Sequence, residues 1–498
     1  METNRGAPTP PIAFAGDAAA VRGRLDNSRV EVGDLLNAEL AATGADVSTA
    51  SAEISEASRD WWPLAMIWAL DDQVTARASV IVRPHSADEV AAVLRLCNEA
   101  RIPVTAAAGR SGVCGASVPV LGGVLLDLTA MTGIKSVDHT SMLVDVMPGT
   151  FGDVFEDELR ARYGVTCGHW PQSIALSTVG GWLACRGAGQ LSTRYGKIED
   201  IVSGLDVVLA DGTLVTTEDS HRAAVGPDLT QLFVGSEGTL GVIVGARLRL
   251  HPIPPAEIRA AFAFTSFTDG LDAMRRIVQR GATPAVLRLY DATEADRSYK
   301  TGDAHVLLAM DEGDAHIVDA TRRIIDEECA SARVIDVGLV EQWMGHRNDV
   351  SALEALISRG FVVDTMEVSA SWAALPAVYE RATAAIQGVE HTMVASAHQS
   401  HSYTDGACLY FTFAGKPPAA DREAYYRAAW DAGQRAVLAA GGALSHHHGV
   451  GLNRSRFVSE ALGAGFGVLQ SVKDALDPNG ILNPGKLGLA GPFGDVNW

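Results

Sequence analysis

The sequence predicts an α+β fold with more than one domain. A chain of 498 residues is too long for a single hydrophobic core, so two or three domains are expected. From about residue 75 to about residue 255, β-branched strand segments alternate with segments of helical spacing. Beyond residue 255, longer strands and helices favour an antiparallel sheet covered by helices.

The first expected domain covers residues 59–255. It follows a lead-in, residues 1–58, that is rich in alanine, serine and acids and that we expect to be partly mobile. The domain starts with the apolar "RDWWPLAMIWAL". The segments "ASVIVRP", "SADEVAAVLRLCNEARI" and "PVTAAAG" then predict a βαβ unit, and "DIVSGLDVVLADGTLV" predicts a hairpin with an Asp-Gly turn. The proline-rich "HPIPP" ends the domain.

The second expected domain covers residues 256–440 and is followed by a C-terminal segment, residues 441–498. "FTDGLDAMRRIVQRG" predicts a helix, and "PAVLRLYD" and "HVLLAMDEG" predict strands. "DREAYYRAAWDAGQRAVLAAGG" predicts a long helix that ends at two glycines. That helix leads into "ALSHHHGVG", and the chain finishes with a short helix and a Pro-Asn-Gly turn.

The composition is that of a soluble globular protein, with 47% hydrophobic and 20% charged residues. Acids outnumber bases by 60 to 40, and a formal net charge of −20 argues against nucleic acid as a partner. The six cysteines form no C-x-x-C pair, which favours reduced thiols and a cytoplasmic location. We find no apolar run of roughly 20 residues and no signal peptide.

Glycine-rich loops in the first domain indicate a phosphate-bearing cofactor. "AGRSGVCGA" (108–116) follows a predicted strand, and glycines let backbone N–H groups converge on an anion. Its spacing is G-x-x-G-x-x-G instead of the dinucleotide fingerprint G-x-G-x-x-G, so alone it could be a structural turn. "PQSIALSTVGGWLACRGAGQ", "RYGKIED" and "FVGSEGTLGVI" add further loops of this kind. Together they suit a long, folded cofactor.

In their order, these segments resemble the FAD-binding domain of the vanillyl-alcohol oxidase superfamily. "GHWPQSIALSTVGGW…RYGKIED" and "GSEGTLGVI" resemble alkylglycerone-phosphate synthases (alkyl-dihydroxyacetonephosphate synthases), the flavoenzymes of ether-lipid synthesis. The resemblance runs from about residue 59 to about residue 490. It implies a vanillyl-alcohol-oxidase-type FAD-binding domain of two subdomains, then a cap domain that carries the substrate site. The C-terminal segment would return to the FAD-binding domain.

The resemblance also assigns the residues that bind FAD. The first loop has no histidine for a covalent tether, so we expect non-covalent FAD. Arg110 stands where the family has a small hydroxyl residue; it could pair with the pyrophosphate or simply face solvent. The candidate FAD-binding residues are Thr105, Ala106, Ala107, Ala108, Gly109, Arg110, Ser111, Pro171, Gln172, Ser173, Ser177, Thr178, Gly180, Gly181, Cys185, Arg186, Gly187, Ala188, Ser236, Glu237, Gly238, Thr239, Leu240, Gly241 and Val242.

The stretch "SHHHGVG" (445–451) raises three alternatives: a metal site, acid–base chemistry or a surface loop. We expect no metal, because the histidines have no partners at dependable ligand spacing. In an extended segment, neighbouring side chains alternate, so all three rings could not face one point. The stretch matches the synthase motif, which implies catalytic roles for His447 and His448 and a supporting or solvent-facing role for His446.

Two further residues fall on functional positions of the family. Tyr410, in the strand-like "ACLYFTF", would be the catalytic tyrosine near flavin N5, although a core tyrosine is the usual occupant of such a strand. Arg288, in "AVLRLYD", would also be functional, with a structural arginine as the alternative.

The resemblance weakens at the substrate's phosphate site. Leu353 occupies the position of a family arginine and His398 that of a second; Arg347 or Arg359 could substitute after a small shift in alignment.

The resemblance implies exchange of an acyl for an alkyl group on a ketone-type substrate, with flavin N5 as the electrophile. The alternative is an FAD-dependent oxidase or dehydrogenase that takes a hydride from a hydroxy acid or alcohol. For the first reaction a lipid-like small molecule is expected, with peripheral membrane contact through an apolar patch. A homodimer is the usual assembly of such folds.

Overall fold

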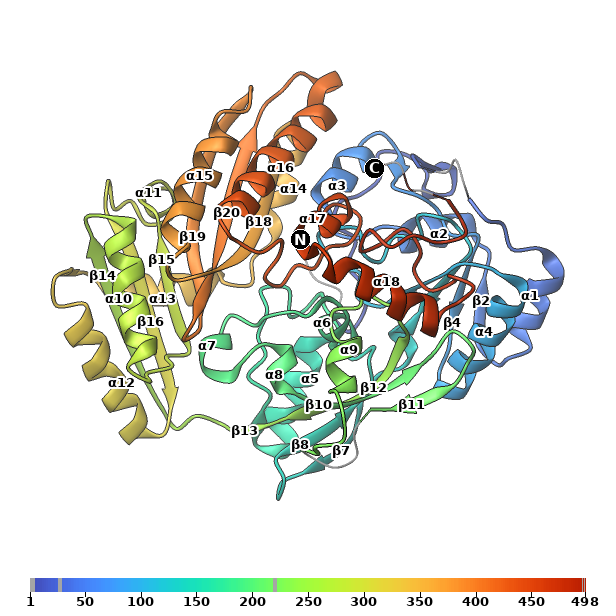
Figure 1. The fold of residues 1–498 in the computed structure, drawn as a ribbon, viewed down its shortest axis with the longest axis horizontal. Coiled ribbons are helices and arrows are strands. Elements are labelled where there is room, and N and C mark those ends of the chain that lie inside the picture. Colours follow the sequence, from blue (N-terminus) through green and yellow to red (C-terminus); the bar gives the residue numbers. More distant parts are fainter. Residues whose placement is uncertain (1–4, 26–28, 218–221, 495, 497) are drawn as a thin grey trace.

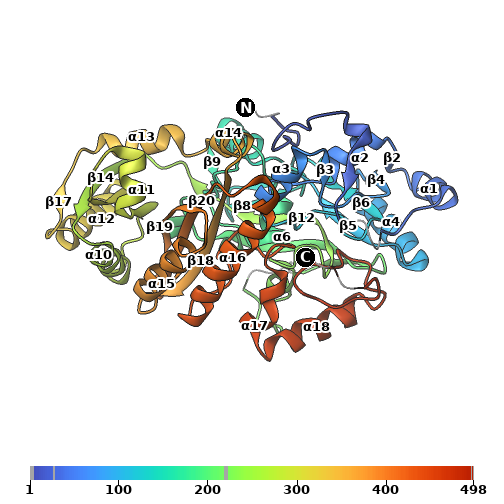
Figure 2. The same ribbon diagram turned by 90° about the horizontal axis from the view of Figure 1, so that it is seen from above.

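The computed structural model describes residues 5–25, 29–217, 222–494, 496 and 498. The cap strands, coloured yellow to orange, lie at one end of the molecule, and the N-terminal subdomain, in blue, lies at the other (Figures 1 and 2). The α+β class is confirmed, since three sheets of four, five and seven strands carry helices on their faces.

The N-terminal subdomain is built on a four-stranded sheet of order β2-β4-β6-β5. The predicted βαβ unit is present, and β4 and β5 both pair in parallel with β6, which lies between them. Ser86 caps α4 by accepting a hydrogen bond from the Glu89 amide at 3.2 Å. The elements are β1 (Arg22–Gly23), α1 (Asp34–Ala41), β2 (Asp46–Ser48), α2 (Ser51–Ala57), α3 (Pro63–Ala69), β3 (Gln73–Val74), β4 (Val80–Arg83), α4 (Ala87–Ala100), β5 (Val104–Ala107) and β6 (Val124–Asp127).

The segment expected to be a separate lead-in differs from that expectation. Strand β2 pairs with β4 in antiparallel fashion, and Ile54 and Ala57 of α2 are buried against Ile81 and Leu125. In this stretch apolar and polar residues alternate over only a few positions. The sequence therefore gives no clear sign that β2 is a strand or that it pairs with β4. From β2 onward the chain is part of the first subdomain.

The second subdomain carries a five-stranded sheet of order β11-β10-β12-β8-β7. The predicted hairpin is formed by β10 and β11, with Gly212 in the left-handed conformation at its turn. The elements are β7 (Ile134–Asp138), β8 (Leu143–Val146), α5 (Gly152–Glu158), β9 (Val165–Thr166), α6 (Val179–Cys185), α7 (Ser192–Tyr195), α8 (Ile198–Ile201), β10 (Val202–Val208), β11 (Leu214–Thr216), α9 (Leu229–Phe233), β12 (Val242–Arg249) and β13 (His251–Pro252).

The cap is a seven-stranded antiparallel sheet of order β17-β14-β16-β15-β19-β20-β18. Its register places Tyr410 of β20 between Glu367 of β18 and His398 of β19. The elements are β14 (Ala256–Phe264), α10 (Phe267–Gln279), β15 (Val286–Tyr290), α11 (Ala292–Tyr299), β16 (His305–Gly313), α12 (Ala315–Glu328), β17 (Arg333–Val334), α13 (Gly338–His346), α14 (Ser351–Ser358), β18 (Val362–Ser371), α15 (Leu375–Gln387), β19 (Thr392–Ser402), β20 (Gly406–Gly415) and α16 (Arg422–Ala439).

The C-terminal segment carries α17 (Val458–Leu462) and α18 (Gly465–Leu476) and lies beside the first two subdomains (Figure 1). The buried Lys473 ammonium donates to the carbonyls of Thr239 and Leu482, both at 2.8 Å. Asn483 donates to the carbonyls of Ala116, at 2.9 Å, and Glu237, at 2.7 Å. These contacts fix the return of the chain to the loops expected to bind FAD.

Among the described helices, none has both the length and the apolar character needed to span a bilayer. All six cysteine thiols are free, and only Cys185 is not fully buried.

Candidate active site

The candidate FAD-binding residues form three groups that the fold brings together. They lie at the end of β5 and in the loop after it (105–111), in the loop before α6 and along that helix (171–188), and in the loop before β12 (236–242). A Cβ atom added to Gly109 would lie 2.3 Å from the Leu176 carbonyl oxygen, so the first and second groups are in direct contact. The Glu237 amide donates to the Ala184 carbonyl at 2.9 Å and joins the third group to α6.

Glycines in these loops leave backbone surface that protein atoms do not cover. A Cβ atom added to Gly112 would meet only the Asp60 carboxylate, at 3.7 Å, and one added to Gly238 would meet only the Ala106 Cβ atom, at 3.8 Å. Close approach of a phosphate to the backbone requires such open positions. Asp60 Oδ2 accepts from the Gly115 amide at 2.9 Å and holds the first loop in shape. The residues present therefore fit a long, phosphate-bearing cofactor.

Arg110 is turned inward in the first loop. Its side chain is 13% exposed, and its guanidinium pairs with Asp127 Oδ2 at 3.2 Å. Asp127 also pairs with Arg83 at 3.3 Å. The solvent-facing alternative is thus wrong, because a buried carboxylate at the end of β6 draws the cation inward. A contact between Arg110 and a pyrophosphate stays a prediction.

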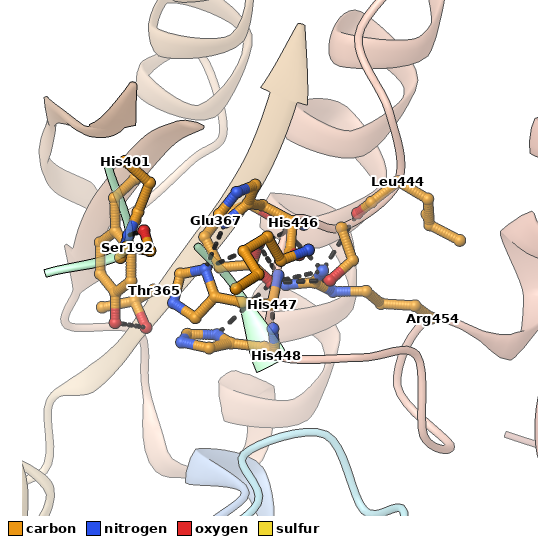
Figure 3. Close-up of polar contacts among 12 residues, drawn as sticks. Ser192, Thr365, Glu367, His401, Leu444, His446, His447, His448 and Arg454 are labelled. Carbon is orange, nitrogen blue, oxygen red and sulfur yellow. Dashed lines mark hydrogen bonds and ion pairs between the residues drawn. The ribbon is translucent and has the colours of Figure 1, made fainter. Parts of the chain in front are cut away.

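The three histidines surround one buried carboxylate, that of Glu367 on β18 (Figure 3). The backbone amides of His446, His447 and His448 all donate to Glu367; the last two distances are 3.0 and 2.9 Å. Arg454, whose side chain is 0% exposed, pairs with Glu367 Oε1 at 2.9 Å. Ser445 Oγ donates to the same oxygen at 2.8 Å. Glu367 therefore receives five donors and sets the path of the loop.

A second buried glutamate holds the other half of "SHHHGVG". Glu237 Oε1 accepts from the Val450 amide at 2.6 Å, and Glu237 Oε2 accepts from the Gly451 amide at 2.9 Å. Glu237 belongs to the domain expected to bind FAD, and Glu367 belongs to the cap. The histidine loop is therefore fastened to both domains.

The premise of an extended segment is wrong, because the loop bends around Glu367 and each histidine ring lies next to the following one. The ring centroids of His446 and His447 lie 5.1 Å apart, and those of His447 and His448 lie 4.6 Å apart. His446 is buried, and its Nε2 and Nδ1 atoms lie 2.9 Å from the Tyr403 hydroxyl and from His447 Nδ1. The burial of His446 and these two contacts agree with the supporting role, one of its two expected roles, and the role itself stays a prediction.

The three imidazoles are neutral at pH 7. Burial lowers the pKa of His446 to about 3 and that of His448 to about 4. Burial, reinforced by His448 and His401, brings the pKa of His447 well below its ordinary value of 6.5. The loop therefore offers proton acceptors in a buried setting, and a standing cationic role is disfavoured.

Tyr410 lies next to the histidines. Its ring centroid is 5.4 Å from that of His448 and 6.1 Å from that of His447. Its hydroxyl donates to Thr365 Oγ1 at 3.0 Å. Burial raises the pKa of the phenol above its ordinary value, so Tyr410 carries its proton at neutral pH. The structure thus brings together a protonated phenol and neutral imidazoles.

Arg288 reaches Tyr410 through His398. Arg288 Nη2 lies 2.6 Å from His398 Nε2, and His398 Nδ1 lies 3.0 Å from Glu294 Oε1. Burial, then Arg288, lowers the pKa of His398 to about 4, so the neutral ring donates from Nδ1 and accepts at Nε2. The His398 ring stacks on Tyr410 with centroids 4.9 Å apart. Arg288 therefore lies one residue away from the predicted catalytic centre.

Four side chains have the composition of a metal site. Glu367, Cys408, His446 and His447 each place one donor atom within 4.8 Å of the others. Both oxygens of Glu367 are already engaged by the loop amides and Arg454. Burial raises the pKa of the Cys408 thiol well above 9.0, which keeps it protonated. The expected absence of a metal stays a prediction.

Comparison with known proteins identifies the family. Residues 78–218 match the family described as FAD binding domain, and residues 253–487 match FAD linked oxidases, C-terminal domain. An uncharacterized FAD-linked oxidoreductase of Escherichia coli strain K12 (YgcU) is 31% identical over 431 residues, which cover 82% of this chain and 88% of the relative. The chain belongs to the FAD-linked oxidase family.

An alkyldihydroxyacetonephosphate synthase of Dictyostelium discoideum is 30% identical to this chain over 455 residues, which cover 83% of this chain and 74% of the relative. A solved structure of an alkyldihydroxyacetonephosphate synthase superposes with a TM-score of 0.78 and 24% identity, over 96% of this chain and 89% of that one. At that identity the superposition shows the fold alone. The superposition confirms the vanillyl-alcohol-oxidase-type fold. The family matches and the relatives confirm an FAD-dependent enzyme.

Sequence reasoning missed the two glutamates that organise the candidate active site. Glu237 was assigned to FAD, and Glu367 drew no attention within "DTMEVSASW". Two acids, Asp364 and Glu367, within a strand that is otherwise mostly apolar or small were the available signal, because a fully buried carboxylate needs a partner. Arg454, its partner, lies 87 residues further along the chain.

Proposed function

We propose that this enzyme exchanges an ester-linked acyl group for an alkyl group on a ketone-type substrate, as alkylglycerone-phosphate synthases do. The observation that carries the proposal is the cluster of Tyr410, His447 and His448, with ring centroids 4.6–6.1 Å apart. Bound FAD would supply an electrophilic N5 atom. The Tyr410 hydroxyl would give a proton to the departing acyl group, and a neutral imidazole would accept one from the incoming alcohol.

A redox reaction is the second candidate. The E. coli relative is named an oxidoreductase, and Leu353 stands where the synthase resemblance places an arginine. In this reaction His447 or His448, both neutral, would take the hydroxyl proton of a hydroxy acid or alcohol. Bound FAD would accept the hydride.

Anaerobic mixing distinguishes the two reactions. Purified protein with FAD is mixed either with an acylated dihydroxyacetone phosphate plus a fatty alcohol, or with a series of 2-hydroxy acids and alcohols. The synthase reaction predicts an ether product and an unchanged visible flavin spectrum at the end of turnover. Bleaching of the flavin by a hydroxy acid or alcohol, without an ether product, would establish the redox reaction instead.

We further propose that FAD is held without a covalent bond, because the first loop, residues 105–111, contains no histidine. After precipitation of the purified protein with acid, the flavin should appear in the supernatant and run with authentic FAD on chromatography. Flavin that stays with the precipitate and with one peptide after digestion would contradict this prediction.

A further inference from the structure

A cavity of about 360 Å³ lies between the cap and the FAD-binding domain. From the cap, its walls include Arg288, Tyr290, Trp343 and Arg347; from the FAD-binding domain they include Gln172 and Gln190. Two contacts connect the cavity with Tyr410: Arg288, in the cavity wall, contacts His398, and the His398 ring stacks on Tyr410. It therefore adjoins the predicted catalytic centre without containing it.

Arg347 gives this cavity a positive charge that has no ion-pair partner among the described residues. Its guanidinium lies 4.8 Å from the centroid of the Trp170 ring and 5.9 Å from that of Trp343. The residue is half-buried, and its side chain has neither an ion pair nor a hydrogen bond with any residue that the structure describes. Burial lowers the pKa of Arg347, and the carboxylates of Glu312 and Glu257, which form no ion pair with it, offset this only in part. A cation partly removed from water without a paired carboxylate is costly, so this position favours an anionic ligand.

The loop that carries Arg347 is fixed to the FAD-binding domain. Gln190 Nε2 donates to the Arg347 carbonyl at 2.8 Å, and Gln172 Nε2 donates to the Asp349 carbonyl at 2.9 Å. In return, Asn348 Nδ2 donates to the Gln172 carbonyl at 2.9 Å. Gln172 is also a candidate FAD contact. The position of the guanidinium is therefore tied to the loop that would hold the cofactor.

Arg288 adds a second guanidinium to the same cavity. Its Nη2 atom is engaged by His398, but its buried Nε atom has no hydrogen-bond partner among the described residues. The carboxylate in the wall, Glu294, has a cation of its own, Arg297, at 3.5 Å. Because Arg297 offsets the charge of Glu294, Arg288 and Arg347 leave the cavity wall with a net positive charge. Two guanidiniums can form paired N–H···O bonds with a planar or tetrahedral oxyanion.

We propose that this cavity binds the oxyanion, phosphate or carboxylate, at one end of the substrate, and that Arg347 is the residue that selects for it. The proposal rests on the proposed function, because it assigns the charged end of the molecule whose other end reacts beside Tyr410. Leu353, at the position of the absent arginine, packs on α14 against the large hydrophobic core. Of the two possible substitutes, Arg347 lines the cavity and Arg359 is exposed outside it.

The test measures anion binding to the FAD-loaded protein by titration calorimetry, once with inorganic phosphate and once with oxalate. We expect one of them to bind saturably and the Arg347→Gln variant to weaken that binding about tenfold or more, as expected for loss of a charge-assisted contact. Arg347→Lys should retain part of the affinity. Arg359→Gln, the matched exposed control, should bind as the wild type does. Stronger phosphate binding would indicate a phosphate monoester substrate, and stronger oxalate binding a carboxylate.

The proposal is overturned if neither anion saturates, or if Arg347→Gln binds as tightly as the wild type while its flavin content and melting temperature are unchanged. Binding is measured without turnover, so its failure is separate from failure of the proposed reaction. An enzyme that forms no ether product can still show anion binding that depends on Arg347. An enzyme that forms the ether product can still lack this anion binding.

Discussion

Replacing Glu367 with glutamine is expected to lower the free energy of unfolding by about 3–5 kcal/mol, the range for removing one partner of a buried ion pair. Glutamine has nearly the same shape, but its amide group would point N–H bonds at donors that now face a carboxylate. Arg454, with a side chain that is 0% exposed, would keep its charge without a counter-ion. The histidine loop would lose its anchor in the cap, so flavin-dependent turnover should fall together with stability.

The loss of stability in Glu367→Gln should depend on pH, and the depressed pKa of Glu367 sets the direction of that dependence. Burial alone would raise the pKa of Glu367, but Arg454, His448 and the loop amides bring it from the ordinary 4.5 down to about 2. A carboxylate with a depressed pKa in the folded state adds stability above its unfolded pKa and loses it as the pH falls through the folded value. The difference in the free energy of unfolding between the wild type and Glu367→Gln should therefore be largest above pH 4.5 and should decrease towards pH 2.

Urea unfolding of both proteins across this pH range, followed by circular dichroism, measures the difference. Glu390→Gln is the matched control, because that side chain is 90% exposed and its loss should change stability by no more than about 0.5 kcal/mol. A Glu367→Gln protein as stable as the wild type at neutral pH would show that the loop does not depend on this carboxylate.

The sequence predicted well those parts of the fold in which the signal is local. The capped helix α4 and the hairpin of β10 and β11 each depend on residues close together in the chain: Ser86 at a helix start, and Gly212 in a tight turn. The glycine loops could be located for the same reason. Strand β2 was missed because it is three residues long and is stabilised only by its pairing with β4.

The sequence predicted which side chains form the candidate site but not the contacts that hold them in place. Tyr410, His447 and His448 do come together, as the resemblance implied. Local reasoning failed on the loop, since alternation holds for extended backbone and here three successive amides turn towards one carboxylate about 80 residues earlier. A buried charge organises its surroundings through tertiary contacts, and a single sequence does not display them. The same applies to His398, whose neutral state is fixed by Arg288 and Glu294.

Replacing Tyr410 with phenylalanine is expected to reduce turnover by about 10²–10⁴-fold, the contribution of a positioned general acid or base, whichever of the two reactions the wild type catalyses. The change removes one hydroxyl and its hydrogen bond to Thr365, so stability should fall by only about 1 kcal/mol. The aromatic stack on His398 is kept. Flavin content should therefore match that of the wild type.

The measurement is the rate of ether formation or of flavin bleaching, with flavin content and melting temperature recorded for the same samples. Tyr425→Phe is the control: its hydroxyl lies 3.1 Å from Thr392 Oγ1 on the cap, away from the histidine loop, and its loss should leave the rate unchanged. If Tyr410→Phe retains the wild-type rate, the proton on the phenol takes no part in the slow step. In that case the neutral imidazoles of His447 and His448 would have to handle both protons, and His448→Asn should then lower the rate more than Tyr410→Phe does.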